Sequence, residues 1–198
     1  MSRENPVIGL LGGSFNPVHI GHAMVASYMQ QFTDLDEVWM VLSPLNPLKE
    51  NPSALLPDVK RLKMLEIAVK PLKGVDVCDI ELSMPKPSYT IDTLRLLSRR
   101  YPRRRFKLII GSDNWKNFSH WKDYQKIIDE YGVIIYPRPG YPLPPIYEDN
   151  VDTVNAPVCD LSSTWVRNAI ARGRKMNIFL PPGVYDYIES NGLYMNQK

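Results

Sequence analysis

The sequence predicts an α/β fold: a single doubly wound, Rossmann-like parallel sheet with helices on both faces. Two observations carry this prediction. Short apolar runs alternate with amphipathic stretches along the chain, which is the pattern of βαβ units and of a mainly parallel sheet covered on both faces. Right-handed crossovers between such units then favour the doubly wound arrangement.

The predicted strands are short runs rich in Val, Ile, Leu and aromatic residues. The first strand ends at Gly12 and Gly13, which permit a tight turn. Proline cannot join a ladder or a helix interior, so we expect the Pro-rich stretch 137–145 to be a surface loop before the last strand. The predicted strands span 7–11, 38–42, 75–77, 106–110, 133–136 and 152–154.

The predicted helices have apolar residues at helical spacing. Ile91, Leu94 and Leu97 follow one another at intervals of three, and Pro57 is placed to open the helix that follows it. The predicted helices span 19–32, 57–69, 89–97 and 121–131, with two more from about 163 and about 182. We expect one domain over 1–198, with a small helical C-terminal portion from about 160.

The composition is that of an ordinary globular protein. Of 198 residues, 44% are hydrophobic and 23% charged, and 24 Lys and Arg against 21 Asp and Glu give a net charge of +3. No apolar run reaches the ~18 residues of a membrane span, and the N-terminus lacks a signal peptide's apolar region. Cys78 and Cys159 have no metal-ligand spacing and suggest no disulfide framework. We therefore expect a cytoplasmic protein with no membrane partner.

One dense basic cluster, Arg99 to Arg105, lies where a helix should end and a strand begin. Cations near a helix C-terminus and in a solvated turn explain it without a ligand. A polyanion-binding patch is the alternative. Since the net charge is too small to argue for nucleic acid, we expect no nucleic-acid partner.

The segment after the first strand is the first candidate site, because ligands of an open α/β sheet bind beyond the carboxyl ends of its strands. It reads GGSFNPVHIGH from Gly12 to His22. His19 and His22 share one face of the first helical turn, whose N–H groups and positive dipole end suit a phosphate. A metal site and two incidental helix histidines are the alternatives, whereas the G-x-G-x-x-G fingerprint and the P-loop are absent.

A second candidate site is the segment Ser162-Ser163-Thr164 with Arg167 one turn later. Hydroxyl residues at a helix start can be simple caps. Together with the guanidinium and the helix N–H groups, they also describe an anion site. Two such helix N-termini are expected to hold a polyphosphate across the crevice of the sheet.

These two segments resemble the paired motifs of the HIGH-type nucleotidylyltransferase superfamily, and within it the bacterial nicotinate-nucleotide adenylyltransferases. The run PSYTIDTL from Pro87 to Leu94 resembles that family's PSYTxDTL segment. The run IGSD from Ile110 to Asp113 resembles its strand end IGAD, and Trp121 matches its downstream tryptophan. The resemblance covers nearly the whole chain in the expected order.

The resemblance implies adenylyl transfer from ATP to nicotinate mononucleotide, giving nicotinate adenine dinucleotide (deamido-NAD) and pyrophosphate in NAD biosynthesis. It implies catalytic roles for His22, which would stabilise the α-phosphate in the transition state, and for His19 at the triphosphate. The implied ATP-binding residues are Gly13, Ser14, Phe15, His19, His22, Gly111, Asp113, Ser163, Thr164 and Arg167. The implied pyridine-nucleotide residues are Lys49, Ser88, Tyr89, Thr90 and Trp121.

Several interpretations remain open at this point. Asn16 stands where the family commonly has Asp, which removes a charge near the phosphates. Without the resemblance, Tyr89 would be read as a core residue at a helix entry and Trp121 as a core residue of an amphipathic helix. Other adenylyltransferases of the superfamily, with nicotinamide mononucleotide or phosphopantetheine as acceptor, are the alternative function, and a nucleotide- or RNA-binding module is a remote one.

The expected partners are the small-molecule substrates ATP and nicotinate mononucleotide, and a homo-oligomer is left open. Mg²⁺ is expected to arrive with ATP and to be held by phosphate oxygens and water. The sequence offers no carboxylate cage for it, and Mg²⁺ keeps several of its waters. No protein metal ligand is therefore predicted.

Overall fold

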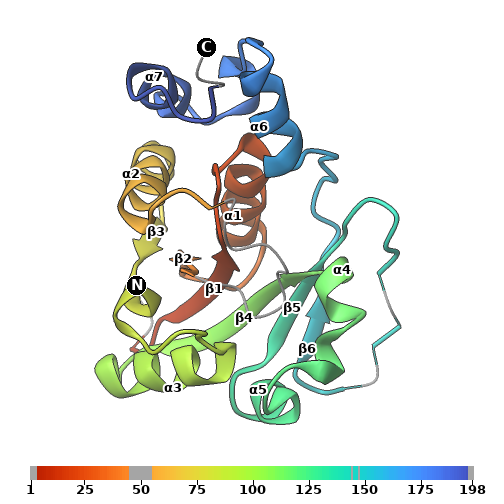
Figure 1. Ribbon diagram of the computed structural model, residues 1–198. Coiled ribbons are helices and arrows are strands. Elements are labelled where there is room, and N and C mark those ends of the chain that lie inside the picture. Colours follow the sequence, from red (N-terminus) through yellow and green to blue (C-terminus); the bar gives the residue numbers. More distant parts are fainter. Residues whose placement is uncertain (1–3, 45–54, 144, 147, 196–198) are drawn as a thin grey trace.

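The computed structural model describes residues 4–44, 55–143, 145–146 and 148–195. Within this part of the chain one parallel sheet has the strand order β3-β2-β1-β4-β5-β6 (Figure 1). The strands are β1 (Val7–Gly13), β2 (Glu37–Leu42), β3 (Val75–Cys78), β4 (Arg105–Gly111), β5 (Val133–Tyr136) and β6 (Val151–Thr153). This is the order of a doubly wound sheet, in which the strand order reverses between β1 and β4. The predicted fold class is confirmed.

Helices cover both faces of the sheet (Figure 1). One face packs against α1 and α2, whose core continues into side chains of α6 and α7, and the other face packs against α3 and α5. The helices are α1 (Ile20–Phe32), α2 (Asp58–Val69), α3 (Thr90–Arg100), α4 (Ser112–Trp115), α5 (Tyr124–Tyr131), α6 (Ser163–Ala171) and α7 (Val184–Ser190). Short 3₁₀ turns are η2 (Ile80–Ser83), η3 (Phe118–His120) and η4 (Asn177–Phe179). No helix in these described segments is long and apolar enough to cross a membrane.

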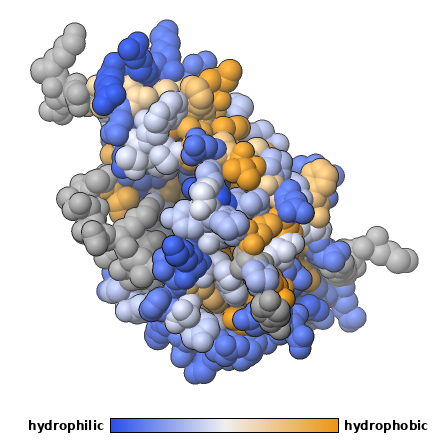
Figure 2. Space-filling view, turned by 90° about the vertical axis from the view of Figure 1, so that its right-hand side faces the viewer, coloured by the Kyte–Doolittle hydropathy of each residue, from blue (hydrophilic) through white to orange (hydrophobic). Residues whose placement is uncertain are grey.

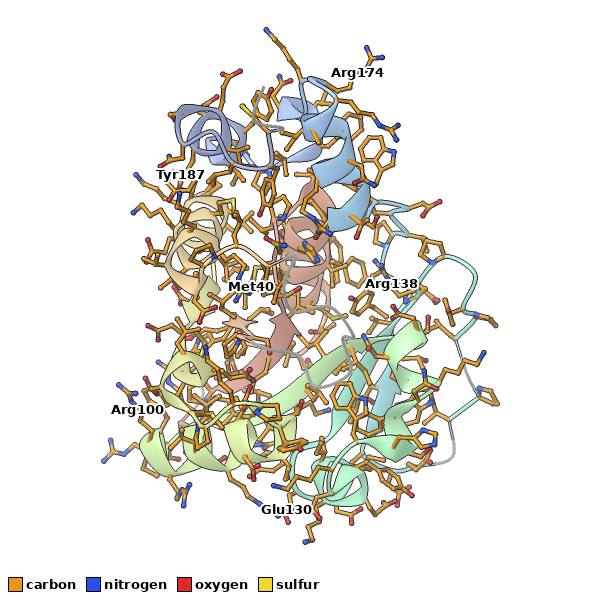
Figure 3. All side chains as sticks on the ribbon, in the orientation of Figure 1. Met40, Arg100, Glu130, Arg138, Arg174 and Tyr187 are labelled. Atoms are coloured by element: carbon orange, nitrogen blue, oxygen red, sulfur yellow. The ribbon has the colours of Figure 1, made fainter. Side chains whose placement is uncertain are left out.

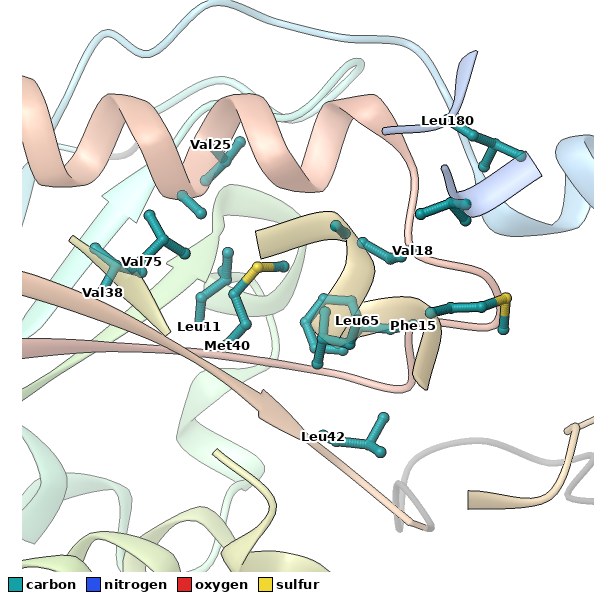
Figure 4. Close-up of a cluster of buried hydrophobic side chains, with 14 of the residues drawn as sticks. Leu11, Phe15, Val18, Val25, Val38, Met40, Leu42, Leu65, Val75 and Leu180 are labelled. Atoms are coloured by element: carbon teal, nitrogen blue, oxygen red, sulfur yellow. The ribbon is translucent and has the colours of Figure 1, made fainter. Parts of the chain in front are cut away.

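The central strands are buried on both sides because their side chains alternate between two cores. On β1, Leu11 contributes to the core under α1 and α2, whereas Leu10 contributes to the core under α3 and α5. Figure 4 shows the first core, where Phe15 and Val18 pack with Leu65 of α2. The turn between β1 and α1 is therefore anchored in the core by its own apolar side chains.

Two local predictions around β4 differ from the structure. A four-residue helix, α4, follows β4 directly and includes Asp113; so short a helix leaves no periodic pattern in the sequence. The helix predicted from Trp121 begins instead at Tyr124, and Trp121 follows η3 in an extended conformation. Trp121 is thus placed on a connection rather than on an amphipathic helix.

The basic cluster lies far from the carboxyl ends of the strands. Arg99 and Arg100 form the last turn of α3, as the helix-terminus interpretation predicts. Arg104 pairs with Glu37 at 2.8 Å and stacks over the ring of Trp39. Figure 2 shows a mostly hydrophilic surface in the lower part of the molecule, where α3 and α5 lie in Figure 1.

Candidate active site

The turn between β1 and α1 carries the first predicted motif and is held from outside by the second. Arg167 of α6 donates a hydrogen bond to the Asn16 carbonyl at 2.8 Å. Ser163 Oγ donates to the Pro17 carbonyl, also at 2.8 Å. The two motifs thus lie side by side in direct contact, and their expected joint hold on a polyphosphate stays a prediction.

The hydroxyl residues of the second motif have three different partners. Ser162 is the N-cap of α6 and accepts the Trp165 backbone N–H at 3.2 Å, so the plain capping role is confirmed for this residue. Ser163 holds the first motif, as described above. Thr164 Oγ1 accepts a second guanidinium hydrogen bond from Arg167 at 3.3 Å. Their predicted contacts with the β- and γ-phosphates stay a prediction.

Asn16 is buried within the same turn and acts as a hydrogen-bond acceptor. Its Oδ1 accepts from the Tyr194 hydroxyl at 2.7 Å and from the Leu56 backbone N–H at 3.3 Å. Burial strongly raises the pKa of Tyr194, so this hydroxyl stays protonated and can donate. An uncharged amide oxygen serves this acceptor role, so the missing carboxylate leaves these contacts intact.

His19 and His22 stack on each other at the start of α1. Their ring centroids are 3.6 Å apart, and the Phe15 ring packs edge-on against His22 at 5.1 Å. The His19 backbone N–H donates to His22 Nδ1 at 3.2 Å. Because Nδ1 accepts, the neutral His22 ring carries its proton on Nε2. The predicted common face of the two histidines is confirmed, with His19 as the N-cap.

His19 is uncharged at neutral pH. The residue is 3% exposed, and its Nδ1 has no hydrogen-bond partner among the residues described. Burial, with a smaller contribution from the charge of Arg138, lowers the pKa of His19 from 6.5 to about 4. His19 therefore brings a neutral ring, not a cation, to this end of the crevice.

The ends of β4 and β5 place an ion pair beside this turn. Arg138 Nε lies 3.7 Å from Asp113 Oδ2, and Figure 3 shows Arg138 between α4 and the side of the molecule formed by α1 and α6. A Cβ atom on Gly111 would lie 2.4 Å from Asp113 Oδ1 and 2.7 Å from Arg138 Cγ, so a side chain at this position would displace the ion pair. Arg138 is not among the predicted site residues, although its place just after a strand is a signal that could have found it.

A cavity of about 190 Å³ opens between the carboxyl ends of β1 and β4, where the strand order reverses. It brings together predicted residues from three distant parts of the chain: Gly13, Ser88, Tyr89, Thr90, Gly111 and Trp121. The predicted pyridine-site residues are thus assembled in one place, except Lys49, which lies outside the described residues.

The first turn of α3 opens onto this cavity with unused donors. Tyr89 is the N-cap, and the backbone N–H groups of Tyr89 and Thr90 have no partner within the described segments. Below them, the buried Glu81 accepts from Ser88 Oγ at 2.8 Å and from Thr93 Oγ1 at 2.9 Å. Through these two bonds Glu81 holds the start of α3 in place. The sequence did not predict this role, because a single acidic residue forms no repeating pattern. Tyr89 is 38% exposed, so its interpretation as a core residue is wrong.

Trp121 forms another part of the cavity wall. Its ring packs at a tilt against Phe118, with the centroids 5.2 Å apart. Its Nε1 is buried without a hydrogen-bond partner in the part of the chain that the structure describes. Next to it, Lys122 lies over the ring of Tyr89 at 4.8 Å and so links this wall to the start of α3.

Comparison with known proteins gives one family. Residues 10–169 match the cytidylyltransferase-like family. A Bacteroides fragilis protein named "Probable nicotinate-nucleotide adenylyltransferase" is 44% identical over 185 residues, which cover 91% of this chain and 90% of that protein. The chain belongs to the cytidylyltransferase-like family and, within it, to the nicotinate-nucleotide adenylyltransferases. A Bacteroides thetaiotaomicron protein with the same name is 43% identical over 95% of this chain and 94% of its own length.

Solved structures show the same fold. Plasmodium falciparum nicotinic acid mononucleotide adenylyltransferase complexed with NaAD has a TM-score of 0.79 at 23% identity. The match covers 96% of this chain and 98% of that one. The same Plasmodium protein complexed with APC gives a TM-score of 0.78 at 22% identity. The doubly wound sheet is therefore shared with a structurally characterised nicotinate-nucleotide adenylyltransferase.

Acid destabilisation should report the buried neutral His19. The unfolded chain protonates this ring below pH 6.5, whereas the folded protein does so only near pH 4. The free energy of unfolding is therefore unaffected by the protonation of His19 above pH 6.5. It falls by about 3 kcal/mol as the pH approaches 4, because the unfolded chain gains a proton that the folded protein does not. Urea denaturation across this range should show a smaller loss in His19→Gln than in the wild type, and equal losses would contradict the buried neutral state.

Arg167 should contribute to nucleotide affinity through the guanidinium predicted to contact the β- and γ-phosphates. Arg167→Ala removes this group and also releases the Asn16 carbonyl; a hydrogen bond from a charged group contributes ~1.5–3 kcal/mol, so the affinity for an ATP analogue should fall about tenfold or more. Arg167→Lys should recover only part of it, because an ammonium cannot copy the planar fork. Calorimetric titration measures this, with the exposed Arg174→Ala as control; unchanged affinity in Arg167→Ala would contradict the assignment.

Proposed function

We propose that this chain transfers the adenylyl group of MgATP to nicotinate mononucleotide, forming deamido-NAD and releasing pyrophosphate. One observation carries the proposal: the cavity between β1 and β4 unites the unpaired N–H groups of Tyr89 and Thr90 with the ring of Trp121, beside the β1–α1 turn. The names of relatives that cover most of the chain support the same reaction.

The reaction requires orientation and charge stabilisation rather than a side-chain base. The mononucleotide phosphate is already an anion at neutral pH. One of its oxygens attacks the α-phosphorus in line, the bond from that phosphorus to the bridging oxygen breaks, and pyrophosphate leaves with the bonding electrons. Holding the two substrates in this alignment supplies much of the rate enhancement.

The charge that develops on the α-phosphate needs fixed donors. His22 supplies its Nε2–H, whose tautomer is set by the bond from the His19 backbone to Nδ1. Ser163, Thr164 and Arg167 are the groups for the β- and γ-phosphates. Mg²⁺ enters as part of the substrate, held by phosphate oxygens and water; in the described segments no three His, Cys, Asp or Glu side chains could hold a metal ion.

The adenosine half has candidates at the end of β4. Gly111 leaves room for a close approach of backbone to ligand, and Asp113 is the acceptor for the ribose hydroxyls. Arg138, paired with Asp113, adds a positive charge on the same side of the crevice. This charge would attract the triphosphate, whereas the neutral His19 ring would not.

The pyridine half explains the preference for an acid. Unpaired N–H groups at a helix N-terminus suit a carboxylate, which accepts hydrogen bonds only. The amide of nicotinamide presents an NH₂ group there, so one donor would face another. A site with buried donors rejects the mismatched analogue because those donors lose their partners.

Replacement of His22 by Ala should lower kcat strongly and change KM little. Loss of one transition-state donor typically costs about 10²–10³ in rate. Steady-state kinetics of pyrophosphate release measure this, with Gln31→Ala on the exposed side of the same helix as the control. A folded His22→Ala enzyme with near-normal kcat would remove His22 from the mechanism.

An acceptor panel tests the function itself. With MgATP, kcat/KM for nicotinate mononucleotide should exceed that for nicotinamide mononucleotide by at least about 10²-fold, and phosphopantetheine should give no pyrophosphate release. Trp121→Ala should weaken both mononucleotides without erasing the preference, because stacking does not distinguish acid from amide. Comparable values for the two mononucleotides would assign the nicotinamide-using alternative instead.

A further inference from the structure

Arg61 is a fully buried cation in α2 whose five N–H groups all have acceptors. It lies on the apolar face of the helix, in line with Met64, Leu65 and Ala68. Its side chain has 0% exposure. The acceptors are the carbonyls of Leu56 at 3.0 Å, Ser14 at 2.5 Å, Ser43 at 2.9 Å and Pro44 at 3.3 Å, and Asp58 Oδ1 at 2.5 Å.

These acceptors show what Arg61 joins together. Ser14 follows β1, whereas Ser43 and Pro44 follow β2, so one guanidinium connects the carboxyl ends of two neighbouring strands. Asp58 is its counter-charge and is also bound by Lys86 at 3.1 Å, just before the entry to α3.

A buried guanidinium paired with a half-buried Asp58 is not needed for stability alone. Apolar residues of similar volume often replace such a pair without loss, because removing charges from water carries a large penalty. The surrounding face of α2 is already apolar. We therefore look for the role of this guanidinium in the backbone carbonyl groups that its N–H groups hold.

The bond to Ser14 determines the direction of the next N–H group. In a trans peptide the C=O and the following N–H point in opposite directions. Because the Ser14 carbonyl points at Arg61, the Phe15 N–H points away from α2. This N–H has no partner among the described residues, and Phe15 has a φ of 42°, a left-handed conformation that is unfavourable for a side chain of this size.

We infer that Arg61 is a positioning residue for adenylyl transfer: by holding the Ser14 carbonyl, it aims the Phe15 backbone N–H at the phosphate chain of ATP. The inference rests on the proposed function. Arg61 itself touches no substrate. Its planar guanidinium reaches acceptors after both β1 and β2, which the single ammonium of a lysine cannot do.

Kinetics of Arg61→Lys and Arg61→Met test this role. A loop displaced by about 1 Å can lose about 10²-fold in rate, so we expect kcat per folded enzyme to fall by about that factor. The KM for nicotinate mononucleotide should stay close to the wild-type value, since Arg61 donates no hydrogen bond to Tyr89, Thr90 or Trp121. Lys63→Met, an exposed position on the same helix, should leave kcat unchanged. Variants with a lower urea midpoint but normal kcat per folded enzyme would overturn the inference.

A measurement on the wild type keeps the inference testable if the variants do not fold. In amide NMR spectra, the Phe15 resonance should shift when MgATP or inorganic pyrophosphate is added. A Phe15 resonance that does not move at saturating MgATP would overturn the inference. If the wild type binds MgATP and shifts this resonance but transfers adenylyl to no acceptor, the proposed function fails while the phosphate contact of the Phe15 N–H stands.

Discussion

Hydrogen bonds to the carbonyl groups of a single turn hold the candidate active site together. Arg61 binds the Ser14 carbonyl, Arg167 the Asn16 carbonyl and Ser163 the Pro17 carbonyl. These donors come from α2 and α6, so the turn between β1 and α1 takes its shape only when helices from both halves of the chain are in place. Because each bound carbonyl fixes the orientation of its whole planar peptide group, the loop becomes a rigid part of the core. An enzyme that works by orienting two phosphates depends on such rigidity.

The electrostatics of the crevice follow from burial. His19 sits too deep to be charged at neutral pH, and its partner ring, stacked 3.6 Å away, receives a backbone hydrogen bond on Nδ1. Positive charge beside the proposed phosphate site comes from arginines instead, which stay protonated in any environment. At the pyridine end the donors are backbone N–H groups of α3, whose neutral dipoles select an acceptor by hydrogen-bond polarity. Under the proposed function, the two ends of the cleft therefore attract different groups of the substrates by different means.

The fold and the phosphate turn followed from patterns that the sequence records directly. Alternating apolar runs predicted the parallel sheet, and the segment after the first strand end predicted the β1–α1 turn, because a doubly wound sheet gathers strand ends at one edge. Ser88, Tyr89, Thr90 and Trp121 were predicted only by the family resemblance. What could not be predicted depends on tertiary contacts. Arg61 shares its helical spacing with the apolar Met64, Leu65 and Ala68. This spacing indicates that Arg61 is buried, but it does not indicate which carbonyl groups accept its hydrogen bonds. Glu81 and the direct contact of the two motifs leave no local signal, and α4 is too short to produce a period.

The most direct test of the substrate arrangement is a crystal structure with deamido-NAD bound. The pyridine ring should lie in the cavity between the start of α3 and Trp121, with its carboxylate on the Tyr89 and Thr90 N–H groups. The phosphates should lie at the β1–α1 turn, within hydrogen-bond distance of His22 Nε2 and the Phe15 N–H. A dinucleotide bound with its adenine in the cavity beside Trp121, or with its phosphates away from this turn, would contradict the proposed assignment of the two half-sites.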